Sequence, residues 1–377
     1  MARRAAGRRL AILGAGHAHL DVIRRLRPLT HAGVEVTIVD QDDFWYSGLA
    51  TGMLGGQYEV EHDRISVETL AKRVGARFIR DRITQVDPTA RVVHLAGGKA
   101  LSYDVASLDL GSGVPVDRVE GLGLNAFPAK PIRRLAKLRA DLTRRVQPGN
   151  GRPPQPPRIL VIGGGATACE IALNLRALAD RLNAQAFITL VTSGDRLLNT
   201  FPESASQTIT DLLHHRAITV RSRVAVDRVE PGEAVLSGGD RIGYDLVVAA
   251  IGLVAPPLIG RLGLPTSNEG RLLLDPFLRS IQEPTLFAGG DCATLDRTNL
   301  PRIGVVAVRQ ARVLAHNLRA TFLGGRLRRY RPQRRWLQIL NLGDGTGLAC
   351  WGPFSFRGRA MLAWKDLLDR SFLNQFR

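Results

Sequence analysis

The sequence predicts an α/β fold built from two strand–turn–helix modules, the second inserted in the first, and a small C-terminal cap. Two glycine-rich turns, at 14–19 and 163–168, lie about 150 residues apart. Each follows an apolar, strand-like run, at 10–13 and 159–162, and each precedes a helical pattern. One such turn is a weak signal, whereas two in one chain indicate two Rossmann-like modules that bind dinucleotides.

The first module begins at residue 9 as a strand, a turn and a helix. A second strand over 34–39 ends at Asp40. An acid at this point is placed to accept a hydrogen bond from a ribose hydroxyl, and otherwise caps a turn. Residues 44–58 are rich in glycine, tyrosine and small side chains, so their backbone can lie close to a flat ligand.

The second module interrupts the first. Strand-like runs at 187–192 and 246–251 continue it, and the chain then returns with a strand that ends at Gly290 and Asp291, followed by a helix over about 304–321. We therefore expect a discontinuous first domain (1–115 and 270–330), a second domain (116–269) and a C-terminal segment (331–377).

Composition favours an anionic surface as a partner. The chain of 377 residues is 45% hydrophobic and carries a net charge of +18, with an arginine-dense stretch over 326–335. Such a charge favours polyanions, unless it only reflects an arginine-rich composition spread over the surface. No zinc-finger spacing or RNA-binding aromatic signature accompanies it, so we expect a membrane surface and no nucleic acid.

The start of the chain and its apolar runs predict a cytoplasmic protein. Four arginines stand among the first nine residues, and the short apolar stretch after them leads into the first glycine turn. A strand explains this stretch better than a targeting segment. No apolar run reaches the roughly 18 residues that a membrane-spanning helix needs.

The cysteines and the C-terminal segment carry weaker signals. Cys169, Cys292 and Cys350 lack the spacing of a disulfide scaffold or a metal site, and we expect no metal. Near the C-terminus, apolar residues at 361, 364, 368 and 372 follow a helical spacing among basic residues. This pattern predicts an amphipathic helix that lies on a lipid surface, or one that packs on the protein or on the second subunit of a homodimer.

Six short segments occur together as they do in one group of enzymes. They are GAGHAH at 14–19, YSG at 46–48 followed by Gly52, AKPI at 129–132, GGDCA at 289–293, PRIGV at 301–305 and WKDLLDRSF at 364–372. With them the chain resembles the two-dinucleotide-binding-domain flavoproteins of the pyridine nucleotide–disulfide oxidoreductase superfamily, over nearly its whole length. It is most similar to the branch of type II NADH dehydrogenases and sulfide:quinone reductases, and within it to the oxidoreductase domain found fused to selenophosphate synthetase.

The resemblance implies that the first module binds FAD. The pyrophosphate would lie at the start of the first helix, where backbone N–H groups and the helix dipole favour anions. Asp40 would hold the adenosine ribose. Lys130 would approach the flavin as a catalytic residue, or lie on the surface as an ordinary lysine. The residues implied for FAD are Gly14, Gly16, His17, Ala18, Asp40, Ser47, Gly48, Gly111, Gly290, Asp291, Val305 and Val306.

The resemblance implies a site for NADH or NADPH in the second module. Glu170 matches a glutamate that the family places near the nicotinamide, and we expect it to be catalytic. NADH sites usually have an acid at the end of the second strand, where this chain has Thr192 and Ser193, whereas Arg196 would fit the 2′-phosphate of NADPH. Both coenzymes stay open, and so does a vestigial site. The implied residues are Gly163, Gly165, Ala166, Thr167, Ser193, Arg196 and Gly252.

One departure from the fingerprint concerns the first turn. His19 stands where the third glycine of the motif is usual, so we expect the helix to lie farther from the strand than in a standard module.

The function implied is that of a FAD-dependent, NADH dehydrogenase-like oxidoreductase. It would pass hydride from NAD(P)H through flavin to a quinone-like or other small acceptor, on the inner face of a membrane or free in the cytoplasm. Two alternatives stay open. One is a flavoprotein that uses no nicotinamide and oxidises a sulfur or selenium species with Cys292 and Cys350 as a redox pair. The other is a FAD-binding protein whose second site is dead.

Overall fold

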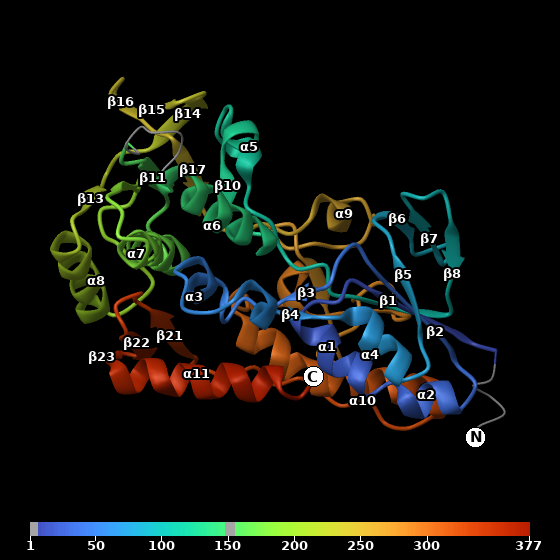
Figure 1. Ribbon diagram of the computed structural model, residues 1–377. Helices are drawn as coiled ribbons and strands as arrows, with labels where there is room; N and C mark the ends of the chain where they lie inside the picture. Colours follow the sequence, from blue (N-terminus) through green and yellow to red (C-terminus); the bar gives the residue numbers. More distant parts are fainter. Residues whose placement is uncertain (1–6, 148–154) are drawn as a thin grey trace.

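The computed structural model describes residues 7–147 and 155–377. Two parallel β-sheets form the centres of two modules that lie side by side, and a small C-terminal unit lies against both (Figure 1). The α/β fold with two Rossmann-like modules and a C-terminal cap is therefore confirmed. The domain boundaries at residues 115, 270 and 330 stay predictions.

The first sheet has five parallel strands in the order β19-β9-β1-β2-β5. The apolar residues of β1, β2, β9 and β19 are buried on both faces, which is typical of parallel sheets covered by helices, and those of the edge strand β5 are partly buried. Its outer strand β19 comes from a later part of the chain than every strand of the second sheet, so the second module is inserted in the first. The strands are β1 (Arg9–Leu13), β2 (Glu35–Asp40), β5 (Arg77–Arg80), β9 (Val105–Leu108) and β19 (Leu286–Ala288).

Helices and small sheets complete the first module. Helix α1 follows β1 directly and packs against α10, the helix that the sequence predicts over about 304–321. The helices are α1 (His17–Arg24), α2 (Arg27–His31), α3 (Ala50–Leu54), α4 (Val67–Arg73) and α10 (Gly304–Leu323), with short turns η2 (Val60–Asp63) and η4 (Gly290–Cys292). The small sheets are β3 (Phe44–Trp45) with β4 (Arg64–Ile65), β6 (Ile83–Asp87) with β7 (Val92–Leu95) and β8 (Ala100–Ser102), and β18 (Leu272–Leu274) with β20 (Ala293–Leu295).

The second sheet repeats this plan in the order β10-β17-β11-β12-β13. The strands predicted at 187–192 and 246–251 are β12 and β17, which end one and two residues earlier. The strands are β10 (Phe127–Pro128), β11 (Arg158–Ile162), β12 (Phe187–Val191), β13 (Ile218–Arg221) and β17 (Leu246–Ala249), with an antiparallel sheet of β14 (Val226–Glu230), β15 (Glu233–Leu236) and β16 (Arg241–Gly243). The helical segments are η3 (Val116–Arg118), α5 (Leu122–Asn125), α6 (Arg133–Val146), α7 (Ala166–Arg181) and α8 (Glu203–His215). Helix α9 (Pro257–Gly260) follows β17 in the chain but contacts β6 of the first module (Figure 1).

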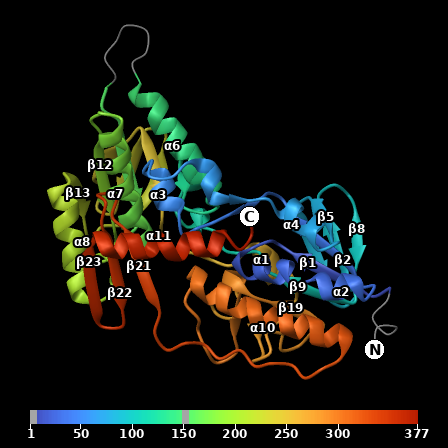
Figure 2. The same cartoon turned by 60° about the horizontal axis from the view of Figure 1, so that its bottom comes forward.

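The C-terminal unit is an antiparallel sheet followed by a long helix. Strands β21 (Leu337–Asn341), β22 (Gly347–Trp351) and β23 (Phe354–Gly358) contact α7 and α8 of the second module. Helix α11 (Arg359–Leu373) runs from this sheet towards the first module, ending near α1 (Figure 2). The cap therefore joins the two modules along one side.

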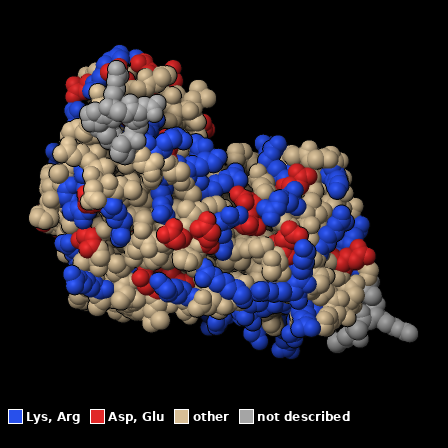
Figure 3. Space-filling model, viewed as in Figure 1, with Lys and Arg blue, Asp and Glu red and all other residues tan. Residues whose placement is uncertain are grey.

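The surface carries its positive charge unevenly. Lys and Arg side chains gather along the lower edge of the molecule in the view of Figure 3, where α10 lies in Figure 1. All six arginines of the predicted dense stretch at 326–335 are exposed. Over the part of the chain that the structure describes, no helix is both long enough and apolar enough to cross a membrane.

Candidate functional site

The first glycine turn connects β1 to α1 at the carboxyl end of the first sheet. Gly14 has a φ of +82°, and a Cβ there would overlap the carbonyl of Asp109, so only glycine fits without strain. Asp40, at the end of β2, accepts a hydrogen bond from the Ala15 N–H at 2.6 Å. The acid that the sequence places at the end of the second strand thus contacts the glycine turn.

Backbone N–H groups at the start of α1 point to an anion site. Gly16 is the N-cap residue of α1 and supplies no capping side chain. Within the described ranges, the N–H groups of Gly16 and His17 have no hydrogen-bond acceptor. Free N–H groups at a helix N-terminus provide the donors that a pyrophosphate requires.

Asp109 is a site residue that sequence reasoning missed. It follows β9, is 3% exposed, and accepts hydrogen bonds from the N–H groups of Ala18 and His19 at 2.8 and 3.0 Å. Burial raises the pKa of Asp109 to about 7, although these two hydrogen bonds act in the opposite direction. Its position at the carboxyl end of a parallel strand was a usable signal, because Asp40 and Asp291 were found by the same criterion.

His19 fills the space between α1 and the sheet. Its side chain is fully buried, Nδ1 donates to the Gly14 carbonyl at 2.5 Å, and Nε2 accepts from the Ser107 hydroxyl at 2.8 Å. Burial lowers the pKa of His19 to about 4, so the ring is neutral near pH 7. The side chain at the third motif position is therefore a hydrogen-bonded spacer between helix and strand.

Lys130 and Asp291 form an ion pair where the two modules meet. Lys130 Nζ lies 2.7 Å from Asp291 Oδ2 and 3.1 Å from Ser112 Oγ, and the Ser112 hydroxyl donates to the same carboxylate oxygen at 2.7 Å. Burial alone would raise the pKa of Asp291, but the charge of Lys130 and these hydrogen bonds hold it below its ordinary value. Gly111 and Gly290 flank the pair, both with positive φ.

An aromatic cluster lies beside the first turn. The His17 ring is 4.8 Å from the Phe44 ring and 6.3 Å from the Phe372 ring of α11, and its Nε2 lies 3.2 Å from Ser47 Oγ. A Cβ added at Gly304, the first residue of α10, would touch both His17 and Ser47 at ordinary contact distance. Burial and the charge of Lys130 lower the pKa of His17 to about 4. The first-module residues singled out in the sequence, including Gly48, Val305 and Val306, therefore gather around α1.

The second glycine turn has the same construction. Gly163 has a φ of +136°, and a Cβ there would overlap the carbonyl of Ala250. Gly165 is the N-cap residue of α7, with open space around it, and Ala166 and Thr167 follow at the start of that helix. This turn too presents backbone N–H groups at the carboxyl end of a parallel sheet.

The remaining residues predicted for the second site lie in the surrounding loops. Ser193 is exposed just after β12, and Gly252 follows β17 with a φ of +101°. The Arg196 guanidinium donates to the carbonyls of Asn199 and Phe201 in its own loop, at 2.8 and 3.4 Å. Because these contacts hold Arg196, the structure gives it a local role whether or not a 2′-phosphate binds there.

Glu170 lies at the junction of all three parts of the fold. Its Oε1 accepts from the Asn341 N–H of β21 at 2.7 Å and from the Thr51 hydroxyl of α3 at 3.2 Å. Burial raises the pKa of Glu170 above its ordinary value, although the charge of Lys365 opposes this. The structure does not place Glu170 beside Lys130, so the two predicted catalytic residues belong to separate clusters.

The buried face of α11 is polar where it meets the first module. Lys365 Nζ contacts Asp369 Oδ2 and the Gly48 carbonyl, both at 2.5 Å, and the Tyr46 hydroxyl donates to Asp369 at 2.8 Å. Asp63 lies in the same charged surroundings, fully buried and with no hydrogen-bond donor to its carboxylate among the described residues. Its desolvation, and the charge of Asp369, raise the pKa of Asp63 to about 8.

Comparison with known families shows the family to which the chain belongs. The sequence model of the pyridine nucleotide-disulphide oxidoreductases matches residues 8–311. The chain belongs to this family.

The alignments of this oxidoreductase with three similar proteins cover nearly the full length of both aligned chains. It is 24% identical to an NADH dehydrogenase-like protein of Bacillus subtilis over 94% of this chain and 96% of the relative. It is 27% identical to a demethylphylloquinone reductase of a Synechocystis strain, over 94% of this chain and 91% of the relative. The structure of NDH2 from Plasmodium falciparum in complex with NADH superimposes with a TM-score of 0.82, at 16% identity, and covers 98% of this chain and 97% of that one. The comparisons do not show the selenophosphate synthetase fusion.

The structure of this pyridine nucleotide-disulphide oxidoreductase gives little support for a redox role of its three cysteines. Cys169, Cys292 and Cys350 are free and buried. Burial raises the pKa of Cys292 to about 12 and that of Cys350 to about 11, whereas a reactive cysteine needs its thiolate form. Among the residues that the structure describes, no group of His, Cys, Asp and Glu could hold a metal ion.

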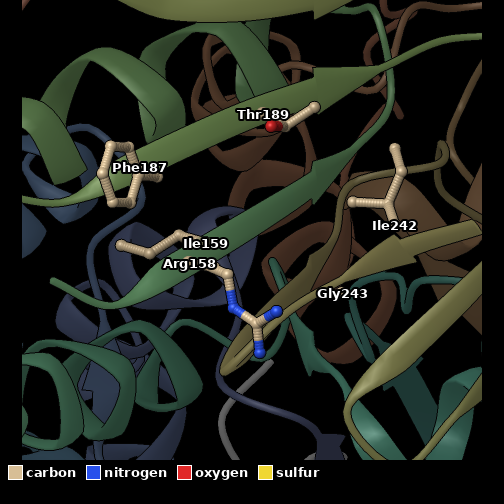
Figure 4. A pocket seen from close by; sticks show the side chains of 6 residues that line it. All are labelled: Arg158, Ile159, Phe187, Thr189, Ile242 and Gly243. Carbon is tan, nitrogen blue, oxygen red and sulfur yellow. The ribbon is translucent and has the colours of Figure 1, made fainter. Parts of the chain in front are cut away.

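A cavity in the second module of the oxidoreductase lies away from the glycine turn. It has a volume of about 220 Å³ and is lined by Arg158, Ile159, Phe187, Thr189, Ile242 and Gly243 (Figure 4). Arg158 and Phe187 begin β11 and β12, so the cavity is at the amino ends of these strands. Ligands of open α/β sheets bind at the carboxyl ends, and this cavity is therefore not the expected nucleotide site.

Proposed function

We propose that the protein is a FAD-dependent NAD(P)H:acceptor oxidoreductase of the NADH dehydrogenase type. The observation that carries this proposal is the pair of glycine turns, each opening a helix at the carboxyl end of its own parallel sheet, in one family member. Full-length relatives named as an NADH dehydrogenase-like protein and a demethylphylloquinone reductase favour a quinone-like acceptor.

The first module has the features that FAD requires. We assign residues 1–115 and 270–330 to its binding, with the pyrophosphate at the free N–H groups of Gly16 and His17 and the adenosine ribose at Asp40. Lys130, paired with Asp291, would bring a positive charge to the flavin side, and the start of α10 would direct its N–H groups there. Bound flavin would supply the hydride and electron transfer that these side chains cannot perform.

The second module, residues 116–269, is proposed to hold the nicotinamide coenzyme. The N-terminus of α7 would bind its pyrophosphate through Gly165, Ala166 and Thr167. Glu170, one turn further along α7, would orient the reacting end through its contacts to Thr51 and Asn341. The module arrangement serves to hold two cofactors in one orientation, which removes the entropic cost of bringing them together during the reaction.

Anaerobic reduction tests this function. Flavin-loaded protein is mixed in a stopped-flow instrument with NADH, NADPH or sulfide, and then with a short-chain quinone. We expect one or both nicotinamides to bleach the flavin band and the quinone to restore it. In Gly163→Ala, a Cβ overlaps the Ala250 carbonyl, so this variant should keep its flavin and lose reduction by nicotinamide. Bleaching by sulfide alone would contradict the proposal.

A membrane-facing side is proposed for the C-terminal unit. The buried face of α11 carries Lys365 and Asp369, whereas its Trp364, Leu367 and Leu368 are exposed. Exposed Trp351, Phe354 and Phe356 of β22 and β23 extend the apolar surface, and exposed arginines at 326–335 lie in the segment that leads to this unit. An apolar surface with arginine nearby suits the interface of an anionic membrane, and we propose peripheral association with its inner face.

Vesicle binding tests the membrane-facing side. Leu367, which is 67% exposed, is replaced by glutamate, with Leu124→Glu on α5 of the second module as the matched control at 92% exposure. Co-sedimentation with phosphatidylcholine–phosphatidylglycerol vesicles should weaken at least about tenfold for Leu367→Glu, through lost apolar burial and added negative charge. Unchanged binding of Leu367→Glu, or equal loss in both variants, would exclude α11 as the contact. If this face instead forms a homodimer, the molecular mass of the protein in solution should rise with protein concentration when no vesicles are present.

Within the superfamily, we place the chain near the oxidoreductase domain that occurs fused to selenophosphate synthetase. The support for this placement is the combination of GAGHAH at 14–19 with WKDLLDRSF at 364–372. In the structure these two segments meet, because His17 and Phe372 stack at 6.3 Å.

A further inference from the structure

Asp109 caps α1 from a different element of the fold. Its Oδ2 accepts hydrogen bonds from the N–H groups of the second and third residues of the helix, as an N-cap side chain would. The true N-cap residue, Gly16, has no side chain for this purpose. A carboxylate from β9 therefore occupies part of the helix N-terminus at which the proposed FAD pyrophosphate would bind.

The second oxygen of Asp109 faces the space between two glycines. A Cβ added at Gly16 would overlap the whole carboxyl group, and one added at Gly290 would overlap Oδ1. No donor among the described residues forms a hydrogen bond with Oδ1. This oxygen therefore lies in the gap between the first turn and η4, next to the start of α1 where we propose that the pyrophosphate binds.

The titratable groups that face Asp109 come from three elements, and one of them is the Cys292 thiol of η4, whose pKa burial and Asp109 raise to about 12. Asp40 at the end of β2 and Asp291 in η4 are both close enough to raise its pKa. On α1 the neighbouring side chain is His19, neutral near pH 7, and the charge of Lys130 is already paired with Asp291. An ionised Asp109 would thus meet an incoming pyrophosphate beside the Asp40 carboxylate and the Lys130-paired Asp291, with no unpaired cation among these groups.

We infer that Asp109 is a positioning residue that couples occupation of the first dinucleotide site to the uptake of one proton from solvent. The inference rests on the proposed FAD site. With a proton on Oδ1, the carboxyl group still accepts from α1 through Oδ2, presents a donor instead of a negative charge to the gap, and leaves the helix dipole available to the phosphates.

The pH range of this coupling follows from the surroundings. Asp109 has a pKa of about 7 in the free protein, and a nearby pyrophosphate raises it further. Flavin affinity is therefore constant below the free pKa, falls by up to about tenfold per pH unit as the pH rises above 7, and levels off beyond the raised pKa. His17 and His19 titrate near pH 4, below this range, whereas Asp63 titrates within it and is the group that the control variant removes.

Flavin titration of the flavin-free full-length protein tests the inference. FAD affinity is measured by quenching of flavin fluorescence between pH 6 and 9 for the wild type and for Asp109→Asn, which keeps an acceptor for the α1 N–H groups but cannot ionise. We expect the wild type to bind less tightly as the pH rises and Asp109→Asn to bind equally over the range. Asp63→Asn is the matched control, because Asp63 also has a raised pKa but lies beside α11, and it should keep the wild-type slope.

Calorimetry on the wild type gives a readout that needs no variant. Titration with FAD at pH 8 in buffers of different ionisation enthalpy should show uptake of about one proton per flavin bound. Tight binding without proton uptake, or the same pH slope in Asp109→Asn, would overturn the role of Asp109 and leave the flavin site standing. Failure of the wild type to bind FAD at any pH would overturn the proposed function and this inference with it.

Discussion

Replacing Gly16 by alanine is expected to yield a folded protein that binds flavin roughly a hundredfold more weakly, equivalent to about 3 kcal/mol. The backbone at Gly16 has a φ of −70°, so alanine fits the local conformation. Its Cβ, however, would overlap all three atoms of the Asp109 carboxyl group. Either that group or the turn must move, and both movements disturb the N–H groups at the start of α1. Flavin content after purification and the dissociation constant for added FAD measure the effect.

Gly165→Ala is the matched control for Gly16→Ala. Gly165 is the N-cap residue of α7 with a φ of −83°, and a Cβ there meets nothing within 4 Å. The control variant should keep its full flavin content and its melting temperature. If Gly16→Ala kept its flavin as well, the pyrophosphate would have to lie elsewhere than at the start of α1.

Loss of stability with rising pH is the second large effect that we expect, and it should be clearly smaller in Asp63→Asn. Asp63 is fully buried, and its carboxylate has no hydrogen-bond donor among the described residues. Its pKa of about 8 lies well above the ordinary value of about 4 for an unfolded chain. Between these values the folded state holds a proton that the unfolded state releases, so the free energy of unfolding falls as the pH rises from 4 to 8.

The size of this effect is set by the separation of the two pKa values. About 4 pH units correspond to an upper limit on the order of 5 kcal/mol. Urea unfolding at pH 5 and pH 8 should show a clear decrease for the wild type and a much smaller one for Asp63→Asn. Asp195→Asn, at an exposed position, should follow the wild type. Equal pH dependence in Asp63→Asn and the wild type would show that the buried carboxyl is not the cause.

The sequence predicted the first glycine turn and its acid well, because both are local consequences of a parallel sheet. Strand ends meet at one edge, so Gly14, Asp40 and Gly290 had to lie close together once the strands were identified. Asp109 also follows a strand of this sheet, at the same edge. The sequence does not identify it as a site residue, since a carboxylate ahead of a glycine turn is equally typical of an ordinary strand end. The contact between Glu170 and Asn341 joins residues far apart in sequence and has no local signal.

The C-terminal helix shows where periodicity stops being informative. The apolar spacing of its sequence predicts a single apolar stripe, with lipid and protein as alternative partners. In the structure the face that packs on the protein includes Lys365 and Asp369, because Tyr46 and the Gly48 carbonyl supply their partners. A pattern of apolar and polar residues identifies the apolar face of a helix. It does not reveal that a face with ion-paired polar side chains is the buried one.

The position of β19 has a consequence for the order in which the chain is made. This strand pairs with β9 through Leu286 and Ala106, and every strand of the second sheet is translated between them. A ribosome therefore releases all the strands of the second sheet while the first sheet still has β9 as an open edge, which is exposed to incorrect strand pairing. The inserted module can fold early on its own contacts, whereas the first must wait for the late arrival of β19, as slow folding of long-range strand pairs would predict. Truncated nascent chains that end before residue 286 should accordingly contain a protease-resistant second module and a protease-sensitive first one.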